Sequence, residues 1–210
     1  RLIEMYIPKH YLTTDKEEIL NFIKTYSFAT IITVKNNFQH AAHLPFVVTE
    51  TENEIILTSH FAKANSQWME ITSNNVLVIF TEPHAYISPK HYDSEMNVPT
   101  WNYLAIHVYG KGKVITEQDK SFAVLDTMIN NFEKEYKTQW DKLPVDYKTK
   151  MLNGIVTFEI LVTDIQAKKK LSQNKKATER QRIISTFEKN NNDNEKAIAE
   201  FMKQNENKIK

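Results

Sequence analysis

The stretch from residue 100 to residue 109 alternates in the way that a β-strand requires. Because successive side chains of a strand point to opposite faces, one face of this strand is aliphatic and the other is aromatic with polar tips. The aliphatic face predicts a core. The aromatic face is suited either to a sheet edge or dimer contact, or to a flat polar ligand. The two alternating sets are Trp101, Tyr103, Ala105, His107 and Tyr109, and Leu104, Ile106 and Val108.

Strands and helices are expected on both sides of this segment. A capping-box sequence at Thr14 precedes apolar residues at helical spacing up to Tyr26, which predicts an amphipathic helix. An order of elements that opens with a hairpin indicates an antiparallel barrel with peripheral helices, a mainly β, α+β fold. Further strands are expected at 28–34, 38–48, 55–59, 76–80 and 155–162, and further helices from Asn65, at 122–136, at 147–152 and after Thr178.

Composition excludes several classes of protein. The chain has no cysteine and three glycines, so disulfides, thiolate sites and glycine-rich phosphate loops are ruled out. No stretch approaches the roughly 20 apolar residues of a membrane span, and we predict a cytoplasmic protein. A net charge of +1 predicts no strong nonspecific attraction to nucleic acid.

Histidines are concentrated between residues 40 and 107. His40 and His43 are separated by an odd number of positions on an expected strand, so they face opposite sides of the sheet. No helical metal-binding spacing, nucleophile elbow or pair of carboxylates accompanies them, and we predict neither a metal site nor a catalytic residue.

Anion binding is the chemistry that the sequence favours. Ser59, His60, Lys63 and Asn65 lie where a strand is expected to pass into a helix, so backbone N–H groups and a lysine converge there. A phosphomonoester fits this arrangement, although a capped helix beside a solvated lysine would leave the same pattern. Taken with the aromatic strand and the segment 40–45, a phosphorylated planar cofactor is the better explanation.

Six blocks in sequence order carry a resemblance to a known family. The chain resembles the PaiB family of bacterial FMN-binding, negative transcriptional regulators of protease production and sporulation. The blocks, from residue 5 to about residue 187, are Met5–Pro8, His40–Pro45, His60–Trp68, Pro83–Pro89, Val98–Tyr103 and Lys170–Asn174.

The resemblance implies an FMN-binding split β-barrel, as in pyridoxamine-phosphate oxidase, over residues 5–187, and a homodimer with FMN at the subunit interface. The segment from Ser59 to Asn65, including His60 and Lys63, would hold the phosphate. His43 and Leu44 would border the isoalloxazine. The contacts to flavin or to the partner would come from Trp101, Asn102 and Tyr103.

The tail over residues 188–210 is expected to be a charged helical appendage that departs from the family. An FMN-dependent oxidoreductase and a haem-binding or haem-degrading split-barrel enzyme remain alternative functions. Contact with nucleic acid is expected to be indirect or weak, because its one candidate patch is a charge run that is usually solvated. That run comprises Lys168, Lys169, Lys170, Lys175, Lys176, Arg180 and Arg182.

Overall fold

A pair of asparagines closes the first hairpin of the fold. Asn36 and Asn37 have φ angles of 52° and 65°, the left-handed region that asparagine tolerates and that a two-residue hairpin loop requires. The loop joins β2 (Phe28–Lys35) to β3 (Phe38–Pro45), which pair antiparallel over their whole length. The hairpin predicted from the sequence is therefore confirmed.

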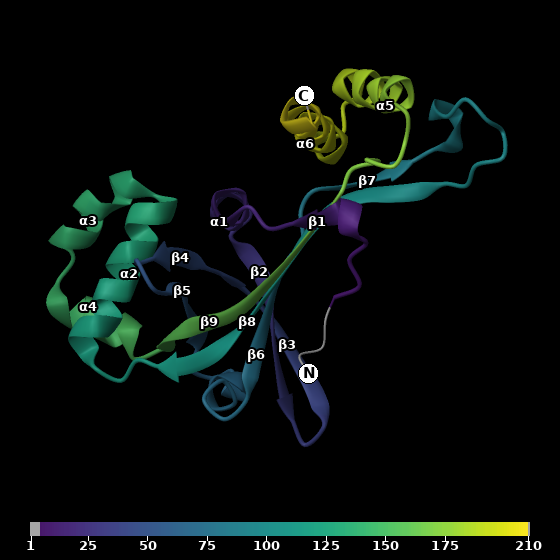
Figure 1. Ribbon diagram of the computed structural model, residues 1–210. Coiled ribbons are helices and arrows are strands. Elements are labelled where there is room, and N and C mark those ends of the chain that lie inside the picture. The colour runs from purple at the N-terminus through teal and green to yellow at the C-terminus, as the bar shows by residue number, and fades with distance from the viewer. Residues whose placement is uncertain (1–4, 210) are drawn as a thin grey trace. The chain divides into compact units, whose positions relative to one another are not determined.

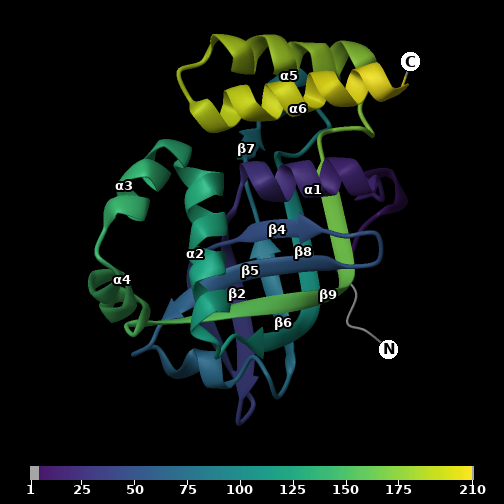
Figure 2. The same cartoon turned by 90° about the vertical axis from the view of Figure 1, so that its left-hand side faces the viewer.

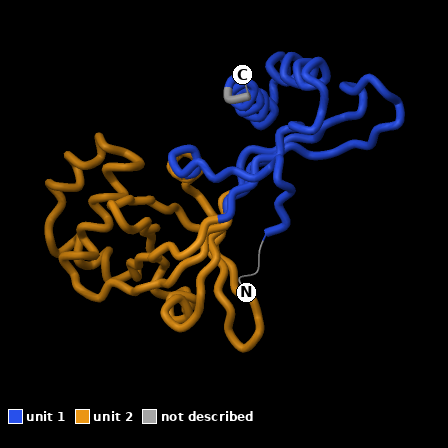
Figure 3. The backbone as a smooth tube through the Cα atoms, viewed as in Figure 1, with its two compact units in different colours: residues 1–19, 81–106, 166–210 blue, residues 20–80, 107–165 orange. Residues whose placement is uncertain are grey.

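The computed structural model describes residues 5–209 (Figure 1), and the chain forms two compact units (Figure 3). Unit 1 comprises the described residues up to 19, residues 81–106 and the residues from 166 onward. Unit 2 comprises residues 20–80 and 107–165. Three elements run from one unit into the other: α1 (Lys16–Thr25), β8 (Thr100–Val114) and β9 (Ile155–Lys170).

Unit 2 is a sheet with peripheral helices. Its strands follow the order β3-β2-β6-β8-β9-β5-β4, so β3 and β4 are the edges of this path. The pairings β2–β3, β2–β6, β4–β5 and β5–β9 are antiparallel, as expected for a barrel that opens with a hairpin. Its other elements are β4 (Val47–Glu50), β5 (Ile55–Ala62), η2 (Ser66–Met69), β6 (Asn75–Phe80), α2 (Gln118–Phe132), η4 (Lys134–Tyr136), α3 (Lys137–Lys142) and α4 (Val145–Leu152).

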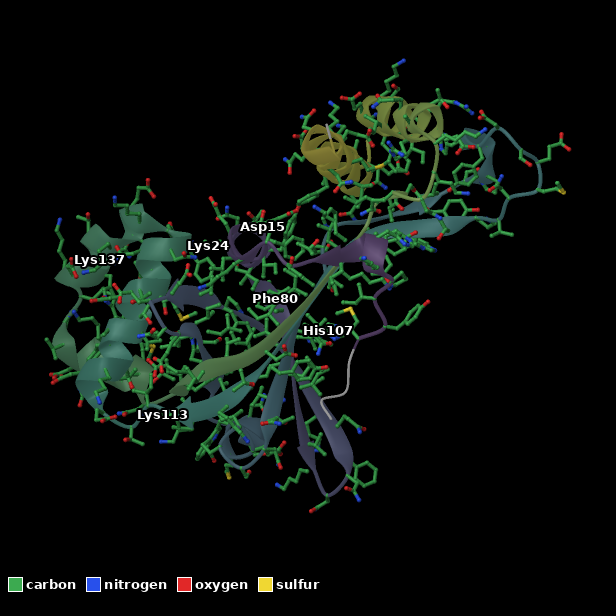
Figure 4. All side chains as sticks on the ribbon, in the orientation of Figure 1. Asp15, Lys24, Phe80, His107, Lys113 and Lys137 are labelled. Atoms are coloured by element: carbon green, nitrogen blue, oxygen red, sulfur yellow. The ribbon has the colours of Figure 1, made fainter. Side chains whose placement is uncertain are left out.

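Phenylalanines form the centre of the unit 2 core. The ring of Phe158 on β9 lies 4.9 Å from that of Phe61 and 6.2 Å from that of Phe46, and Phe46 also packs against Phe80, labelled in Figure 4. All four side chains are at most 1% exposed. Aromatic rings in edge-to-face and offset contact add to the free energy of simple apolar burial.

Helix α2 covers the β4–β5 side of the unit 2 sheet (Figure 2). Its apolar face contributes Val124 and Met128 to a buried cluster with Val47 of β4. A hydrogen bond of 2.8 Å between the hydroxyls of Ser121 and Thr157 joins the same helix to β9. The helix predicted from the amphipathic pattern after residue 122 is thus confirmed, and it begins at Gln118.

Unit 1 is built on the outer parts of the long strands. Strand β7 pairs with β8, and β1 pairs with β9. Helices α5 and α6 lie side by side (Figure 1), with Ile183, Phe187 and Met202 buried. Its own elements are η1 (Lys9–Tyr11), β1 (Leu12–Thr13), β7 (His84–Ile87), η3 (Pro89–His91), α5 (Ala177–Lys189) and α6 (Asp193–Ile209).

The structure differs from the sequence-based expectation at three points. The strand expected at 155–162 continues to Lys170, and residues 84–87 form a further strand. The helix expected after Asn65 is a four-residue 3-10 turn, η2. The expected boundary between residues 187 and 188 falls inside the last turn of α5, and α6 packs on this helix. The division into a domain at residues 5–187 and a tail at residues 188–210 stays a prediction.

Candidate functional site

The loop between β5 and η2 has a fixed backbone and a free cation. Lys63 donates its backbone N–H to the carbonyl of Gly154 at 2.9 Å, and its own carbonyl accepts from the indole of Trp68 at 3.3 Å. Asn65 caps η2 by accepting the N–H of Gln67 at 3.0 Å. The side chain of Lys63 is exposed and makes no ion pair with any described residue. The loop therefore presents an ammonium group that is unpaired within the described part of the chain, and its backbone is held by hydrogen bonds.

Ser59 and His60, near the end of β5, differ in their hydrogen bonding. The hydroxyl of Ser59 is fully buried and donates to the carbonyl of Pro45 at 2.7 Å, so it joins β5 to the end of β3. His60 has a buried Nδ1 atom that finds no hydrogen-bond partner among the described residues. Burial lowers the pKa of His60, which favours a neutral imidazole. An unpaired buried polar atom is costly and indicates a missing partner.

The end of β3 is held against β5, because the hydroxyl of Ser59 donates to the carbonyl of Pro45. His43 is exposed and its ring stacks on Phe28 at 6.5 Å, while Leu44 is half-buried opposite Ala29 of β2. Six of the predicted site residues belong to unit 2, at the end of β3, in β5 and in the loop that follows it: His43, Leu44, Ser59, His60, Lys63 and Asn65.

The other three predicted residues belong to unit 1 (Figure 3). Trp101 is 52% exposed and lies between the rings of His84 and Tyr86, at 5.9 and 5.8 Å. Tyr103 lies beneath the ammonium of Lys168, 5.3 Å from its ring centroid. Both rings keep surface that a ligand or partner can contact.

Asn102 differs from its two neighbours. It is fully buried, its Oδ1 accepts from the hydroxyl of Ser172 at 3.1 Å, and its Nδ2 contacts the sulfur of Met202 at 3.6 Å. These contacts join β8 to α6 and to the residues that follow β9. The alternation of β8 points the amide of Asn102 away from the aromatic face. Its two contacts stabilise unit 1.

Sequence reasoning missed a buried acid. Glu70, 5% exposed, accepts from the hydroxyl of Thr33 at 2.7 Å and contacts Nδ1 of His40 at 2.9 Å, while the ammonium of Lys35 lies 4.0 Å away. Burial alone would raise the pKa of Glu70, but these hydrogen bonds and charges outweigh it and lower the pKa. A glutamate beside a turn carries no sequence signal for this role.

The basic run from residue 168 to residue 182 is largely used inside unit 1. Lys169 contacts Glu18, Arg180 binds Glu206, and Lys176 pairs with Asp93. The remaining partners are the carbonyl of Tyr6 for Lys168, Thr100 for Lys170, Asn97 for Lys175, and Asp93 with the His91 carbonyl for Arg182. Side chains with such partners offer less to a phosphate backbone than a free cationic patch does.

Residues 5–209 contain neither a candidate metal centre nor a candidate membrane-spanning helix. No three histidine or acidic side chains in this part of the chain come together in a way that could hold a metal ion. None of the described helices combines the length and apolar character needed to cross a membrane.

Comparisons with known proteins assign the chain to a family. A sequence model described as "Putative FMN-binding domain" matches residues 5–164. A protein of Bacillus subtilis (strain 168) named Protease synthase and sporulation protein PAI 2 is 42% identical over 209 residues, which cover 98% of this chain and 99% of that protein. The chain belongs to the PaiB family of FMN-binding proteins. FMN is the cofactor that this membership assigns to it.

The alignment with the PaiB relative extends through the tail. Because it covers 98% of the chain, the expectation that the residues after 190 depart from the family is wrong. The packing of α6 on α5 gives the physical reason, since the tail contributes buried residues such as Ile198 to unit 1.

Solved structures support the fold of this PaiB protein. The flavocytochrome Anf3 from Azotobacter vinelandii has a TM-score of 0.62 at 12% identity, covering 79% of this chain and 72% of that chain. The FAD and heme binding protein from Mycobacterium smegmatis has a TM-score of 0.61 at 15% identity, covering 81% and 78%. The fold is a split barrel, mainly β with peripheral helices.

The residues of the β5–η2 loop fit FMN. A phosphomonoester needs cationic and N–H donors, and Lys63 supplies an ammonium without an acidic partner among the described residues. A flavin also carries polar ring and ribityl atoms, which can satisfy the unpaired Nδ1 of His60. η2 has four residues, so its dipole adds little, and at this loop the side chains would have to provide most of the binding.

Proposed function

We propose that the phosphate of FMN binds at the β5–η2 loop, with Lys63 as its cationic partner and His60 and Asn65 beside it. The buried, unpaired Nδ1 of His60 is the observation that carries this proposal. Ser59 contributes indirectly, because its hydroxyl holds the end of β3 against β5.

The ring of FMN is assigned to the end of β3. His43 and Leu44 would border the isoalloxazine, and the exposed faces of Trp101 and Tyr103 would contact the flavin or the partner subunit. Asn102 would support this aromatic surface from behind, through its contacts with Ser172 and Met202. When bound, FMN supplies a redox-active ring, and these side chains bind and orient it and exclude water.

The Lys63→Ala variant tests the phosphate assignment. It is expected to weaken FMN binding by about 1–3 kcal/mol, the range for a hydrogen bond to a charged group. Quenching of FMN fluorescence during titration measures the affinity. Lys24→Ala, which removes an exposed lysine elsewhere in unit 2, is the control and should bind FMN as the parent chain does. Equal affinity of the parent and Lys63→Ala would refute the assignment.

We further propose that the PaiB protein is a homodimer joined at the β2–β3 hairpin. β3 is an edge strand, and apolar side chains on the hairpin are exposed: Phe28 by 64% and Phe38 by 73%. Edge strands with exposed apolar side chains tend to associate with other chains, and a second copy of this chain would bury these side chains.

A charge on the hairpin is expected to disrupt the dimer. Phe28→Glu should shift the protein from dimer to monomer in light scattering coupled to size exclusion, because it buries an unpaired carboxylate in the interface. Val145→Glu on α4, where the parent side chain is 66% exposed, is the matched control and should leave the mass unchanged. A parent chain that is already monomeric would exclude the dimer.

The biological role we propose is regulation of protease production and sporulation, the two processes that the name of the Bacillus subtilis relative mentions. We place this role in the cytoplasm, as expected from the sequence. Contact with DNA would be indirect or weak, because the basic run is engaged within unit 1. Deleting the gene and measuring secreted protease and spore counts tests the role. Unchanged protease and sporulation would count against it.

A further inference from the structure

A groove lies between α5 and η3 in unit 1, and none of its lining residues is among those assigned to FMN. Its volume is about 860 Å³, within the range of ligand sites. One wall is a single face of α5, and the other is η3. The lining residues are Lys90, His91, Ala177, Thr178, Gln181, Arg182, Ser185, Thr186, Lys189 and Asn190.

The charge of this groove has one sign. Lys90, Arg182 and Lys189 line it, and no acidic residue does. Among residues 5–209, Lys90 and Lys189 have no ion-pair partner, whereas Arg182 binds Asp93 and the carbonyl of His91. The groove therefore carries two uncompensated ammonium groups.

The acids near the groove are occupied. Glu188 pairs with Lys203, and Glu195 accepts from the amide of Asn190 at 2.6 Å. Glu179 is buried and accepts the backbone N–H groups of Asp93 and Lys176, at 2.9 and 3.0 Å. None of these carboxylates neutralises the two lysines of the groove through a direct contact.

The remaining side chains of the groove favour a peptide over a nucleic acid. Thr178, Ser185 and Gln181 offer short hydroxyl and amide groups that can bond to a main chain or to carboxylates. A single-stranded nucleic acid would need rings on which its bases stack. His91 is the one ring of the lining, and it is 5% exposed and packed edge-on against Phe187 at 6.2 Å.

We propose that the α5–η3 groove docks an acidic segment of a partner protein. The carboxylates of that segment would pair with Lys90 and Lys189, and its main chain would bond to the polar face of α5. The proposed docking site uses other residues than the FMN site. The inference rests on the proposed regulatory function, to which it adds a protein partner. Charge complementarity of this kind sets specificity and association rate.

The test uses the full chain with FMN bound and a short fluorescent peptide of glutamate, leucine and alanine as the probe. Fluorescence anisotropy measures its affinity for the parent chain and for the double variant Lys90→Glu/Lys189→Glu. We expect the double variant to bind at least about tenfold more weakly, and the parent's binding to weaken with added salt.

The matched control is Lys24→Glu/Lys113→Glu, which makes the same change of charge on two exposed lysines of unit 2, both labelled in Figure 4. It should bind the peptide within about twofold of the parent. Equal weakening by both double variants would overturn the proposal, as would tighter binding of a lysine-containing peptide or of single-stranded DNA. The FMN absorption of each variant reports separately on the flavin site.

Discussion

Replacing Phe158 by alanine is expected to lower the free energy of unfolding by about 3–5 kcal/mol, the range for removing a buried phenylalanine. Its side chain is fully buried and contacts the rings of Phe46 and Phe61. β9, which carries it, is paired on both sides in unit 2, so the sheet cannot easily collapse into the cavity. The loss is a large part of the stability of an ordinary domain.

Urea unfolding followed by circular dichroism measures this change, with Phe132→Ala as the control. Phe132 ends α2 and is 47% exposed, so its truncation should cost less than about 1 kcal/mol. A loss below about 1 kcal/mol for Phe158→Ala would show that this site is not a packed core position.

Removing the buried acid is expected to have the second largest effect. Glu70→Ala should lower the free energy of unfolding by about 2–3 kcal/mol at neutral pH, because it leaves the hydroxyl of Thr33 buried without an acceptor. It also removes the partner of His40 Nδ1. The same urea experiment measures the loss. Glu50→Ala, which truncates an exposed side chain at the end of β4, is the control.

The effect of Glu70 should depend on pH in a defined direction. Its pKa is lowered in the folded chain, so the unfolded chain binds the proton more readily. The stabilisation is therefore complete above the ordinary glutamate pKa and is lost as the pH falls through the lower folded value. The difference in stability between the parent and Glu70→Ala should shrink over that acidic range. A difference that stays constant would contradict the assignment of the charged form.

Much of the fold follows from local patterns. The helical spacing after Thr14 became α1, and the two asparagines closed the β2–β3 hairpin because they accept positive φ. The alternation of residues 100–109 became β8, with Leu104, Ile106 and Val108 buried. These features depend on neighbours in the sequence, which is why they could be predicted.

The candidate site could be predicted only in part. The position of Lys63 in an exposed loop follows from its strand-to-turn context, but the engagement of Ser59 with Pro45 does not. The nine site residues remain a prediction, and the structure shows that their burial and contacts differ. Asn102 is buried beneath the aromatic surface, while Trp101 stays exposed on it.

By itself, the sequence determined the class of fold, the family and the cofactor, because periodicity, turn residues and ordered motifs are local properties of the chain. Only the tertiary structure decided which polar groups are free. The lysines from 168 to 176 find partners far away in the sequence. Glu70 is buried and forms hydrogen bonds with Thr33 and His40, and His60 keeps an unpaired nitrogen. The pairing of charges and the burial of polar atoms depend on contacts between distant segments, which no local pattern records.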